Sequence, residues 1–486
     1  MNTPLRRLAV VITLLFLALL GSTTNVQVIQ AGQLNARPGN ARALYKEFGR
    51  NRGPILVDGN AIAQSVPVKD AYTYLRQYPA GSMYSAVTGY FSSVLYSATG
   101  LEQATDSWLS GTSDRLLYRR IQDILTGHQP SGAAVELTLD PAAQKAAWDA
   151  LGDQRGAAVA IRPSTGEILA LVSKPGFDPN TLASHDSHAV RTAAANLSSD
   201  AGRPLDNRAI AGRGYPPGST FKLITAAAAL SSGRWHATTP TIEGPAVLDL
   251  PGTRADLPNE FSGACGPGGK TTMLVALRIS CNTAFGWLGM QLGEQALADQ
   301  AAKFGFGQEL ELPLKVTPST FPSHLTSAQV AQSAIGQFDV RVTPLQIAMV
   351  TAGIANKGVV MKPNLIRSVR STTSLDVISK PAPQVFSTAV TPQVAAELTQ
   401  MMVDVVQNGT GRSAQIPGIS VAGKTGTAQQ DNGRSPHAWF TAFAPVDNPQ
   451  VAVAVVVEDG GSLGDATSGG RAAAPIAKKI IEAVVR

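Results

Sequence analysis

The chain has 486 residues, enough for about two to four domains with sizeable buried cores. Hydrophobic residues make up 44% and charged residues 15%, and 46 glycines and 31 prolines interrupt every long helical stretch, so wholesale disorder and a coiled coil are excluded. The formal net charge is +6, but no basic run exceeds two residues, so the sequence lacks the concentrated stripe that binds nucleic acid.

The N-terminus has the pattern of a membrane anchor. Arg6 and Arg7 precede the apolar stretch Leu8–Gly21, and positive charge before an apolar segment holds that end in the cytoplasm. With the uncharged residues up to Ala31, the segment reaches the length of about 20 residues that a spanning helix needs. A cleavable signal peptide is the alternative, since its apolar region is also short. Residues 1–31 are predicted to be a cytoplasmic tip and a transmembrane anchor, and the rest is expected to be exported in either case.

Residues 32–133 are predicted to form a small non-catalytic domain of mixed strands and helices. Arg52–Asn60 is typical of a strand that enters a Gly-Asn turn. The aromatic-rich stretch Tyr72–Tyr118 contains no cluster of catalytic residue types, which indicates a docking module or pedestal. A change of composition at His128–Gly132 marks the predicted end of this domain.

Residues 134–486 have the pattern of an α/β (α+β) domain. Pro141–Leu151 is predicted to be a helix with Asp140 as its N-cap. Five segments are predicted to be strands, namely 156–161, 167–173, 418–430, 437–444 and 451–457. They can pair into one five-stranded antiparallel sheet, covered by the helix at 141–151 and by a last helix at 472–485. Residues 180–410 are then a largely helical insertion, and a site is expected in the cleft between insertion and sheet.

A serine and a lysine stand at the start of a predicted helix in the insertion. The turn Tyr215–Gly218 places Ser219 at the helix N-terminus, where free N–H groups stabilise negative charge, and Lys222 follows on the same face. A serine hydroxyl needs a base to become a nucleophile, and a lysine in an apolar site can lose its proton and serve as that base. The alternative is a capping serine and a solvated lysine, because S-x-x-K occurs by chance about once in such a chain.

A second polar motif, Ser280-Cys281-Asn282, lies between two predicted helices. It can point the Ser280 hydroxyl and the Asn282 carboxamide into a cleft, and an ordinary pair of helix caps is the alternative. The two cysteines of the chain, Cys265 and Cys281, belong to no C-x-x-C motif, and an oxidising compartment favours a disulfide between them. Two unrelated buried thiols are the alternative. No H-E-x-x-H occurs, so no metal site is predicted.

A third motif, Lys424-Thr425-Gly426-Thr427, lies in a predicted strand. We expect Lys424 and the hydroxyls of Thr425 and Thr427 to face the same direction, and Gly426 to leave the strand open for a substrate backbone. The order G-K-T is not a Walker A loop here, because β-prone sequence follows it rather than a phosphate-capping helix.

The three motifs, in this order, resemble those of the penicillin-recognising serine transferases. Further segments resemble the class B penicillin-binding proteins, and most of all the actinobacterial penicillin-binding protein A group: Leu137–Asp140, Pro163–Ala170, Phe177–Asn180, Asn207–Ala209, Ile335–Gln337, Val342–Gln346 and Ala355–Gly358. Phe338-Asp339 follows Gly336-Gln337 where many members carry a glycine, so the loop beside the cleft is expected to differ.

The resemblance implies a penicillin-binding transpeptidase fold and a peptidoglycan D,D-transpeptidase that needs no cofactor and is acylated by β-lactams. Ser219 would attack the penultimate D-Ala carbonyl of a stem peptide, and Lys222 would take its proton. Ser280 would relay a proton to the leaving amine, and Asn282 would orient Lys222. The terminal carboxylate would be bound by Lys424, Thr425 and Thr427, and Gly426 would complete the substrate-binding strand. Backbone N–H groups of Ser219 and Thr427 would form the oxyanion hole.

Other functions share parts of this pattern. A D,D-carboxypeptidase or a β-lactamase would use water, where a transpeptidase uses an amine of a second stem peptide. The anchor and the domain at 32–133 favour a wall-assembling enzyme of the cell membrane with its catalytic domain outside. A non-catalytic division scaffold is the alternative of another class, and three intact motifs argue against it. The resemblance also implies a glycosyltransferase or division complex as partner and a role in septal wall synthesis.

Overall fold

The computed structural model describes residues 2–35, 45, 47–116, 131–372, 376–430 and 433–485. The chain divides into two compact units, one made of residues 1–51 and 65–75, the other of residues 52–64 and 76–486. Most of the predicted elements fall within the second unit.

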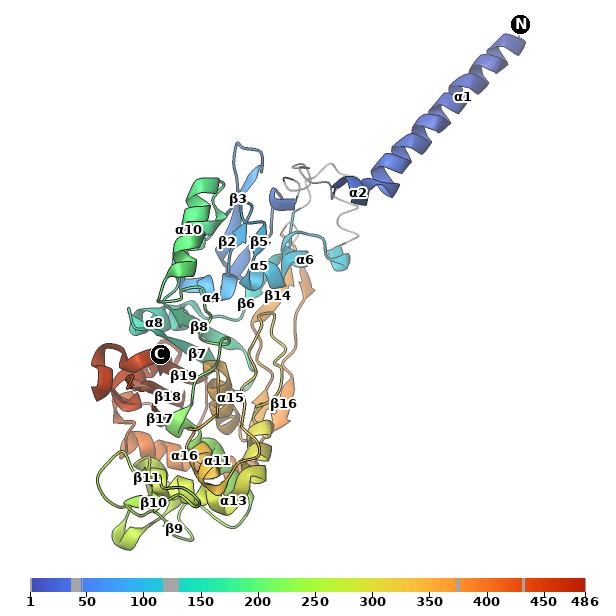
Figure 1. Cartoon of the computed structure of the whole chain (residues 1–486). Helices are drawn as coiled ribbons and strands as arrows, with labels where there is room; N and C mark the ends of the chain where they lie inside the picture. The colour runs from blue at the N-terminus through green and yellow to red at the C-terminus, as the bar shows by residue number, and fades with distance from the viewer. Residues whose placement is uncertain are drawn as a thin grey trace. The chain divides into compact units, whose positions relative to one another are not determined.

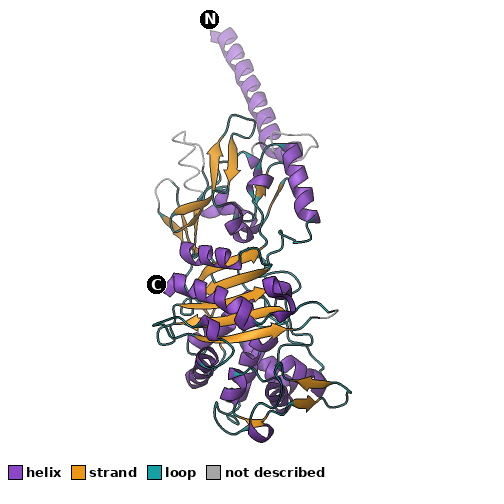
Figure 2. Cartoon of the chain, turned by 90° about the vertical axis from the view of Figure 1, so that its left-hand side faces the viewer, coloured by secondary structure: helices purple, strands orange, loops and turns teal. Residues whose placement is uncertain are grey.

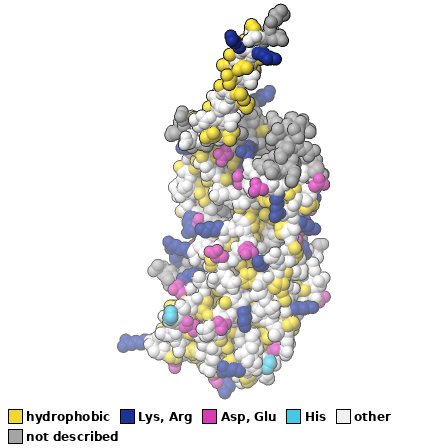
Figure 3. Space-filling model, turned by 90° about the vertical axis from the view of Figure 1, so that its right-hand side faces the viewer, with side chains coloured by type: hydrophobic (Ala, Val, Ile, Leu, Met, Phe, Trp, Pro, Cys, Tyr) yellow, Lys and Arg dark blue, Asp and Glu magenta, His cyan; other side chains and the backbone are white. Residues whose placement is uncertain are grey.

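The first unit begins with helix α1 (Asn2–Thr24), followed by a short π-helical turn and helix α2 (Ala31–Asn35) (Figure 1). Thr3–Ile29 has 27 residues and a mean hydropathy of 2.0, and within the described part of the chain it is the one helix long and apolar enough to cross a membrane. Figure 3 shows apolar side chains along α1 and basic side chains near its N-terminal end. This helix is compatible with a single anchor, and the choice between anchor and signal peptide stays a prediction.

A six-stranded sheet, ordered β15-β14-β6-β1-β2-β3, contains strands from both sides of the predicted domain boundary at residue 133. These strands are β1 (Ile55–Val57), β2 (Asn60–Pro67), β3 (Tyr74–Gln77), β6 (Ala134–Leu137), β14 (Ile366–Arg370) and β15 (Val377–Ser379). The turn after β1 is formed by Asp58 and Gly59 rather than by Gly59 and Asn60, because both of the former have positive φ, 49° and 74°, as a two-residue hairpin turn requires.

The predicted five-stranded antiparallel sheet is confirmed. Its strands are, in spatial order, β17 (Ala422–Ala428), β18 (His437–Ala444), β19 (Val451–Val457), β7 (Gly156–Ile161) and β8 (Ile168–Lys174). Strand β17 is shorter than the predicted strand at 418–430, because the chain turns at Gly418, whose φ is 76°, and Ile416 pairs back with Ile419. The central strands β7, β18 and β19 are buried on both faces.

The two predicted helices cover one face of this sheet. Helix α8 (Pro141–Leu151) begins as expected, with the Asp140 carboxylate accepting the Ala143 N–H at 2.9 Å. It packs with helix α17 (Ala474–Val485) against the sheet through Leu151, Ile476 and Ile480. The opposite face packs against helix α15 (Pro344–Ala355), and Figure 2 shows the strands between these helices.

The insertion at 180–410 combines helices with small two-stranded sheets. Its longer helices are α10 (Ser187–Ser199), α11 (Lys222–Ser231), α13 (Asn282–Lys303), α14 (Ser327–Ala334), α15 and α16 (Pro392–Gln407). Its two-stranded sheets are β9 (Ile242–Glu243) with β12 (Lys270–Thr271), β10 (Val247–Asp249) with β11 (Asp256–Pro258), and β13 (Val359–Met361) with β16 (Val385–Thr388). The expectation of a largely helical insertion therefore missed these small sheets, whose strands of two to four residues are too short to show a period.

Candidate active site

Ser219 lies in a turn that touches the edge strand of the five-stranded sheet. The turn is a single 3₁₀ turn, Gly218–Thr220, directly before helix α11. Gly218 has a φ of 52°, and a Cβ there would lie 2.4 Å from the carbonyl oxygen of Thr427. Only glycine permits this approach, so the backbone of the turn places Ser219 against β17.

The Lys222 amine lies at the centre of the site. Its side chain is fully buried, and its Nζ donates to the Ser280 carbonyl oxygen at 2.8 Å and to Asn282 Oδ1 at 2.7 Å. The Ser280 Oγ is 3.4 Å from the same Nζ. Ser280 has a φ of 60°, a conformation that a non-glycine residue adopts mostly where surrounding contacts impose it. Two of the sequence motifs therefore meet at one lysine.

The third motif reaches the same hydroxyl from the other side. Lys424 is also fully buried, and its Nζ donates to Ser280 Oγ at 2.9 Å and to the Thr425 carbonyl oxygen at 2.8 Å. The Ser280 hydroxyl thus lies between two buried lysines, Lys222 and Lys424. The structure joins Lys222, Ser280, Asn282 and Lys424 by hydrogen bonds, although they were named from sequence patterns far apart in the chain. Ser219 lines the same groove as Asn282.

Burial is the main reason why both lysines have low pKa values. It lowers the pKa of Lys424 to about 7, against the opposing effect of Glu260. It lowers the pKa of Lys222 well below the usual 10.5, and the charge of Lys424 lowers it further, again opposed by Glu260. The positive charge of Lys424 therefore favours the neutral form of Lys222. A neutral Lys222 amine, three residues after Ser219 in the chain, has the protonation state that a general base needs.

The expected orientation of the third motif was wrong for Lys424. Neighbouring residues of a strand point to opposite faces, so Lys424 lies on the face opposite to Thr425 and Thr427. The Thr425 hydroxyl instead bonds the Thr410 hydroxyl at 2.6 Å. Sequence reasoning missed Thr410, because it follows α16 and carries no motif.

Gly426 is needed for packing rather than for an open strand surface. A Cβ at this position would lie 3.0 Å from the Pro217 carbonyl oxygen and 2.9 Å from Trp439 Cβ. The turn before Ser219 therefore occupies the space that we had expected a substrate backbone to use. The missing side chain of Gly426 lets this turn reach the sheet.

A groove of about 1140 Å³ opens beside Ser219. Ser219, Asn282, Thr427 and Glu260 line it, together with Phe338. Phe338 is 40% exposed. Its φ of 57° is a backbone conformation that a glycine would adopt without strain. A groove of this volume has room for a peptide beside Ser219.

A buried carboxylate supports the turn that precedes Ser219. Glu458 Oε1 accepts the Tyr215 hydroxyl at 2.6 Å and the Arg208 Nε at 2.9 Å, and Glu458 Oε2 pairs with Arg155 at 2.8 Å. Burial raises the pKa of Glu458, but the bond from Tyr215 and the two arginines outweigh it and hold this pKa below its usual value. No sequence pattern links these four residues, and they were not predicted.

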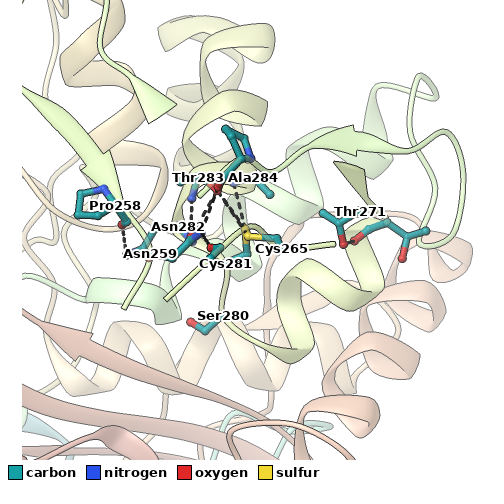
Figure 4. Close-up of a disulfide and its surroundings, with 12 residues drawn as sticks. Pro258, Asn259, Cys265, Thr271, Ser280, Cys281, Asn282, Thr283 and Ala284 are labelled. Atoms are coloured by element: carbon teal, nitrogen blue, oxygen red, sulfur yellow. Dashed lines mark hydrogen bonds between the residues drawn. A yellow bond between two sulfur atoms is a disulfide. The ribbon is translucent and has the colours of Figure 1, made fainter. Parts of the chain in front are cut away.

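The structure joins Cys265 and Cys281 by a disulfide, with their Cα atoms 6.1 Å apart (Figure 4). Cys281 lies between Ser280 and Asn282, and its Sγ accepts the Ala284 N–H at 3.2 Å. The bond therefore ties a loop of the insertion to the second motif.

Loss of this disulfide is expected to destabilise the protein. The bond closes a loop with a sequence separation of 16, and a loop of this size contributes about 3 kcal/mol in the chain-entropy model. Cys265→Ser should lower the free energy of unfolding in urea by this amount. Thiol titration of the unfolded, unreduced protein should find no free thiol, and two free thiols in protein exported by its natural route would refute the bond.

Comparison with known proteins identifies the family. The penicillin-binding protein transpeptidase domain family matches residues 156–482, and the penicillin-binding protein A dimerisation domain family matches residues 52–135. The chain belongs to the class B penicillin-binding protein transpeptidases. It is 45% identical over 495 residues to the peptidoglycan D,D-transpeptidase PbpA of Mycolicibacterium smegmatis, which covers 100% of this chain and 99% of that protein.

Two further relatives come from Mycobacterium tuberculosis. Its peptidoglycan D,D-transpeptidase PbpA is 42% identical to this penicillin-binding protein, over 100% of this chain and 99% of that protein. The structure of penicillin-binding protein A of the same organism, as a ceftriaxone acyl-enzyme complex, matches with a TM-score of 0.87 at 41% identity, over 91% of this chain and 100% of that chain. The similarity to the curated relatives thus extends over the residues that both family models match, 52–135 and 156–482.

Proposed function

We propose that this penicillin-binding protein is a peptidoglycan D,D-transpeptidase that forms an acyl-enzyme on Ser219. The observation that carries the proposal is the fully buried Lys222 amine, bonded to Ser280 and Asn282 one turn after Ser219. The names of the mycobacterial relatives support it, as do the penicillin G and imipenem acyl-enzyme structures of penicillin-binding protein A from M. tuberculosis.

In the first half-reaction, neutral Lys222 takes the proton of the Ser219 hydroxyl while Oγ attacks the penultimate D-Ala carbonyl. Ser280, between the two lysines, passes a proton to the departing nitrogen. The amide C–N bond breaks, D-Ala leaves as the free amine, and the stem peptide stays as an ester on Ser219. In the second half-reaction, the amine of another stem peptide attacks this ester, a new amide forms, and Ser219 regains its proton.

The groups that bind the substrate surround Ser219. The hydroxyls of Thr425 and Thr427 supply hydrogen bonds to the terminal carboxylate from one face of β17, and Lys424 adds positive charge from the opposite face, where its amine bonds Ser280. The backbone N–H groups of Ser219 and Thr427 stabilise the oxyanion, supported by the close approach of the Gly218 turn to Thr427. Removing one such donor typically lowers the rate about a hundred- to a thousand-fold.

The setting of the enzyme belongs to the same proposal. Residues 1–31 form the cytoplasmic tip and membrane anchor, residues 32–133 a docking domain, and residues 134–486 the transpeptidase domain outside the membrane. The apolar helix α1 supports the anchor. We place the enzyme with a glycosyltransferase or division complex in septal wall synthesis, supported by the resemblance to the penicillin-binding protein A group.

Labelling with penicillin tests the nucleophile. We expect stoichiometric, slowly released acylation, and mass spectrometry of a tryptic digest should find the adduct on the peptide that contains Ser219. The variant Ser219→Ala removes the attacking oxygen and should show no label. An adduct on another serine, or undiminished labelling of Ser219→Ala, would show that the nucleophile is misassigned.

The acceptor separates a transpeptidase from a hydrolase. The full chain is given a synthetic pentapeptide ending in D-Ala-D-Ala, with and without a second peptide that carries a free side-chain amine. A transpeptidase releases D-Ala and forms the peptide dimer, detected by mass spectrometry. Release of D-Ala with tetrapeptide acid as the sole product would identify a D,D-carboxypeptidase.

A further inference from the structure

The helix that carries Asn282 begins on a loop that is distant in sequence. Helix α13 starts at Asn282, so its first backbone N–H groups have no partner within the helix. The Asn259 Oδ1 accepts the N–H of Asn282 at 2.9 Å and that of Thr283 at 3.1 Å (Figure 4). The third N–H, of Ala284, donates to the Cys281 sulfur at 3.2 Å. All three donors are therefore satisfied by Asn259 and by the disulfide.

The same loop also fixes the side chain of Asn282. Its Nδ2 donates to the Pro258 carbonyl oxygen at 3.2 Å, which leaves Oδ1 directed to Lys222 Nζ at 2.7 Å. If the oxygen and the NH₂ group of the Asn282 carboxamide exchanged places, the NH₂ group would face the lysine and both bonds would be lost. Two consecutive residues, Pro258 and Asn259, thus set the orientation of the Asn282 side chain and the position of its backbone.

Asn259 is itself held at several points. Its Nδ2 donates to the carbonyl oxygens of Pro245, at 3.2 Å, and Gly263, at 3.1 Å. The Thr283 hydroxyl donates to the same Pro245 oxygen at 2.7 Å. The disulfide closes the far end of the segment, because Cys265 follows six residues after Asn259 and is bonded to Cys281.

We propose that Asn259 is a positioning residue for Asn282, and through it for Lys222, and that the Cys265–Cys281 disulfide holds the segment 258–265 in the position where Asn259 can do so. This rests on the proposed role of Lys222 as the base. A shift of about 1 Å in a group that orients a reacting atom can lower a rate about a hundred-fold, so a small displacement of this segment has a large effect on acylation.

The segment affects the protonation of the base as well as its position. Lys222 is faced by the Asn282 oxygen, by Ser280, by the Lys424 ammonium and by the Glu260 carboxylate. Asn282 Oδ1 and Glu260 favour the charged lysine, and Lys424 disfavours it. The Ser280 carbonyl oxygen and the Phe285 ring also favour the charge. Two of the four groups that do so depend on the segment 258–265: Glu260 is part of it, and Asn282 is held by it.

The experiment measures the second-order rate constant of acylation of the full chain by a fluorescent penicillin, as a function of pH. For Asn259→Ala we expect a maximal rate constant about 10- to 100-fold lower than that of the wild type. The acidic limb of the profile is the part in which the rate constant rises with pH as Lys222 loses its proton. We expect this limb to move to lower pH, because Lys222 loses its well-placed acceptor. Asn259→Asp keeps an oxygen acceptor for both N–H groups, so its maximum should exceed that of Asn259→Ala. Its added carboxylate should move the acidic limb to higher pH.

Asn180→Ala is the matched control. The Asn180 side chain also bonds two backbone groups of a distant segment, the N–H and the carbonyl oxygen of Tyr78, each at 2.9 Å, but it does not line the groove. It should lower the thermal stability and leave the pH profile of acylation unchanged. Reduction of the disulfide in the wild type should lower the acylation rate, as Asn259→Ala does.

The outcomes separate this inference from the proposed function. Absence of acylation at Ser219 in the wild type would refute the proposed function itself. If the wild type is acylated, and a folded Asn259→Ala has the same maximal rate constant and the same acidic limb of the pH profile, the positioning role alone is refuted. If Asn259→Ala does not fold, Asn259→Asp decides, and an acidic limb identical to that of the wild type would overturn the inference.

Discussion

Lys222→Ala is expected to lower the rate of Ser219 acylation about a hundred- to ten-thousand-fold, the usual contribution of a positioned general base. The amine of Lys222 is buried, and it is the group that bonds both Ser280 and Asn282. The other buried amine of the site, that of Lys424, bonds the Ser280 hydroxyl and the Thr425 carbonyl oxygen. The measurement is the rate of labelling by a fluorescent penicillin, and acylation within tenfold of the wild type would show that Lys222 is not the base.

The pH dependence adds a sharper test of the two lysines. The base must be neutral, so the second-order rate constant should rise with pH through the low pKa of Lys222. Lys424 must be charged to bind a carboxylate, so the rate constant should fall again above about pH 7, where Lys424 loses its proton. The wild type should therefore give a bell-shaped profile.

Lys424→Arg distinguishes the two limbs of this profile. Arginine keeps its charge at all accessible pH values, so the alkaline limb should disappear while the acidic limb remains. The variant should also weaken substrate capture more than the chemical step, because the charge stays but the geometry changes. An alkaline limb that persists in Lys424→Arg would assign it to another group.

Local sequence patterns were sufficient to predict the five-stranded sheet and its first and last helices. Strands β7, β18 and β19 are short apolar runs bounded by turns, and such runs are typical of strands buried on both faces. The S-x-x-K motif was equally informative, because a spacing of three residues at a helix start fixes Ser219 and Lys222 on one face. In both cases the information lies within a few neighbouring residues.

Contacts between distant segments could not be predicted. Asn259 bonds Asn282 across 23 residues, and the Glu458 carboxylate binds Arg208 across 250 residues. Asparagine and glutamate in such positions look like ordinary loop residues, since their partners are fixed only by the tertiary fold. The two-residue strands of the insertion were missed for a related reason: a segment of that length has no period to detect.

Glu102→Ala is expected to lower the free energy of unfolding by about 3–5 kcal/mol, since breaking a buried ion pair leaves an uncompensated charge. The Glu102 carboxylate is fully buried between two arginines that are themselves at most 4% exposed. Its Oε2 accepts the Arg52 Nε at 3.1 Å, and its Oε1 accepts the Arg76 Nε at 2.6 Å. The Tyr78 hydroxyl donates to the same Oε1 at 3.3 Å. Without this carboxylate, the buried guanidinium groups of Arg52 and Arg76 each lose an ion-pair partner, and Arg52 keeps its pair with Asp106.

An exposed ion pair of the same chain provides the control for Glu102. Lys145 and Asp149 pair along helix α8 with their side chains 65% and 55% exposed, and such pairs contribute about 0–1 kcal/mol. Asp149→Ala should therefore change the urea midpoint little, while Glu102→Ala shifts it strongly to lower urea. Glu102→Gln keeps the shape and one acceptor but not the charge, so its stability should lie between those of the wild type and Glu102→Ala. Equal, small shifts for Glu102→Ala and Asp149→Ala would mean that water reaches the two arginines and solvates them once the carboxylate is gone.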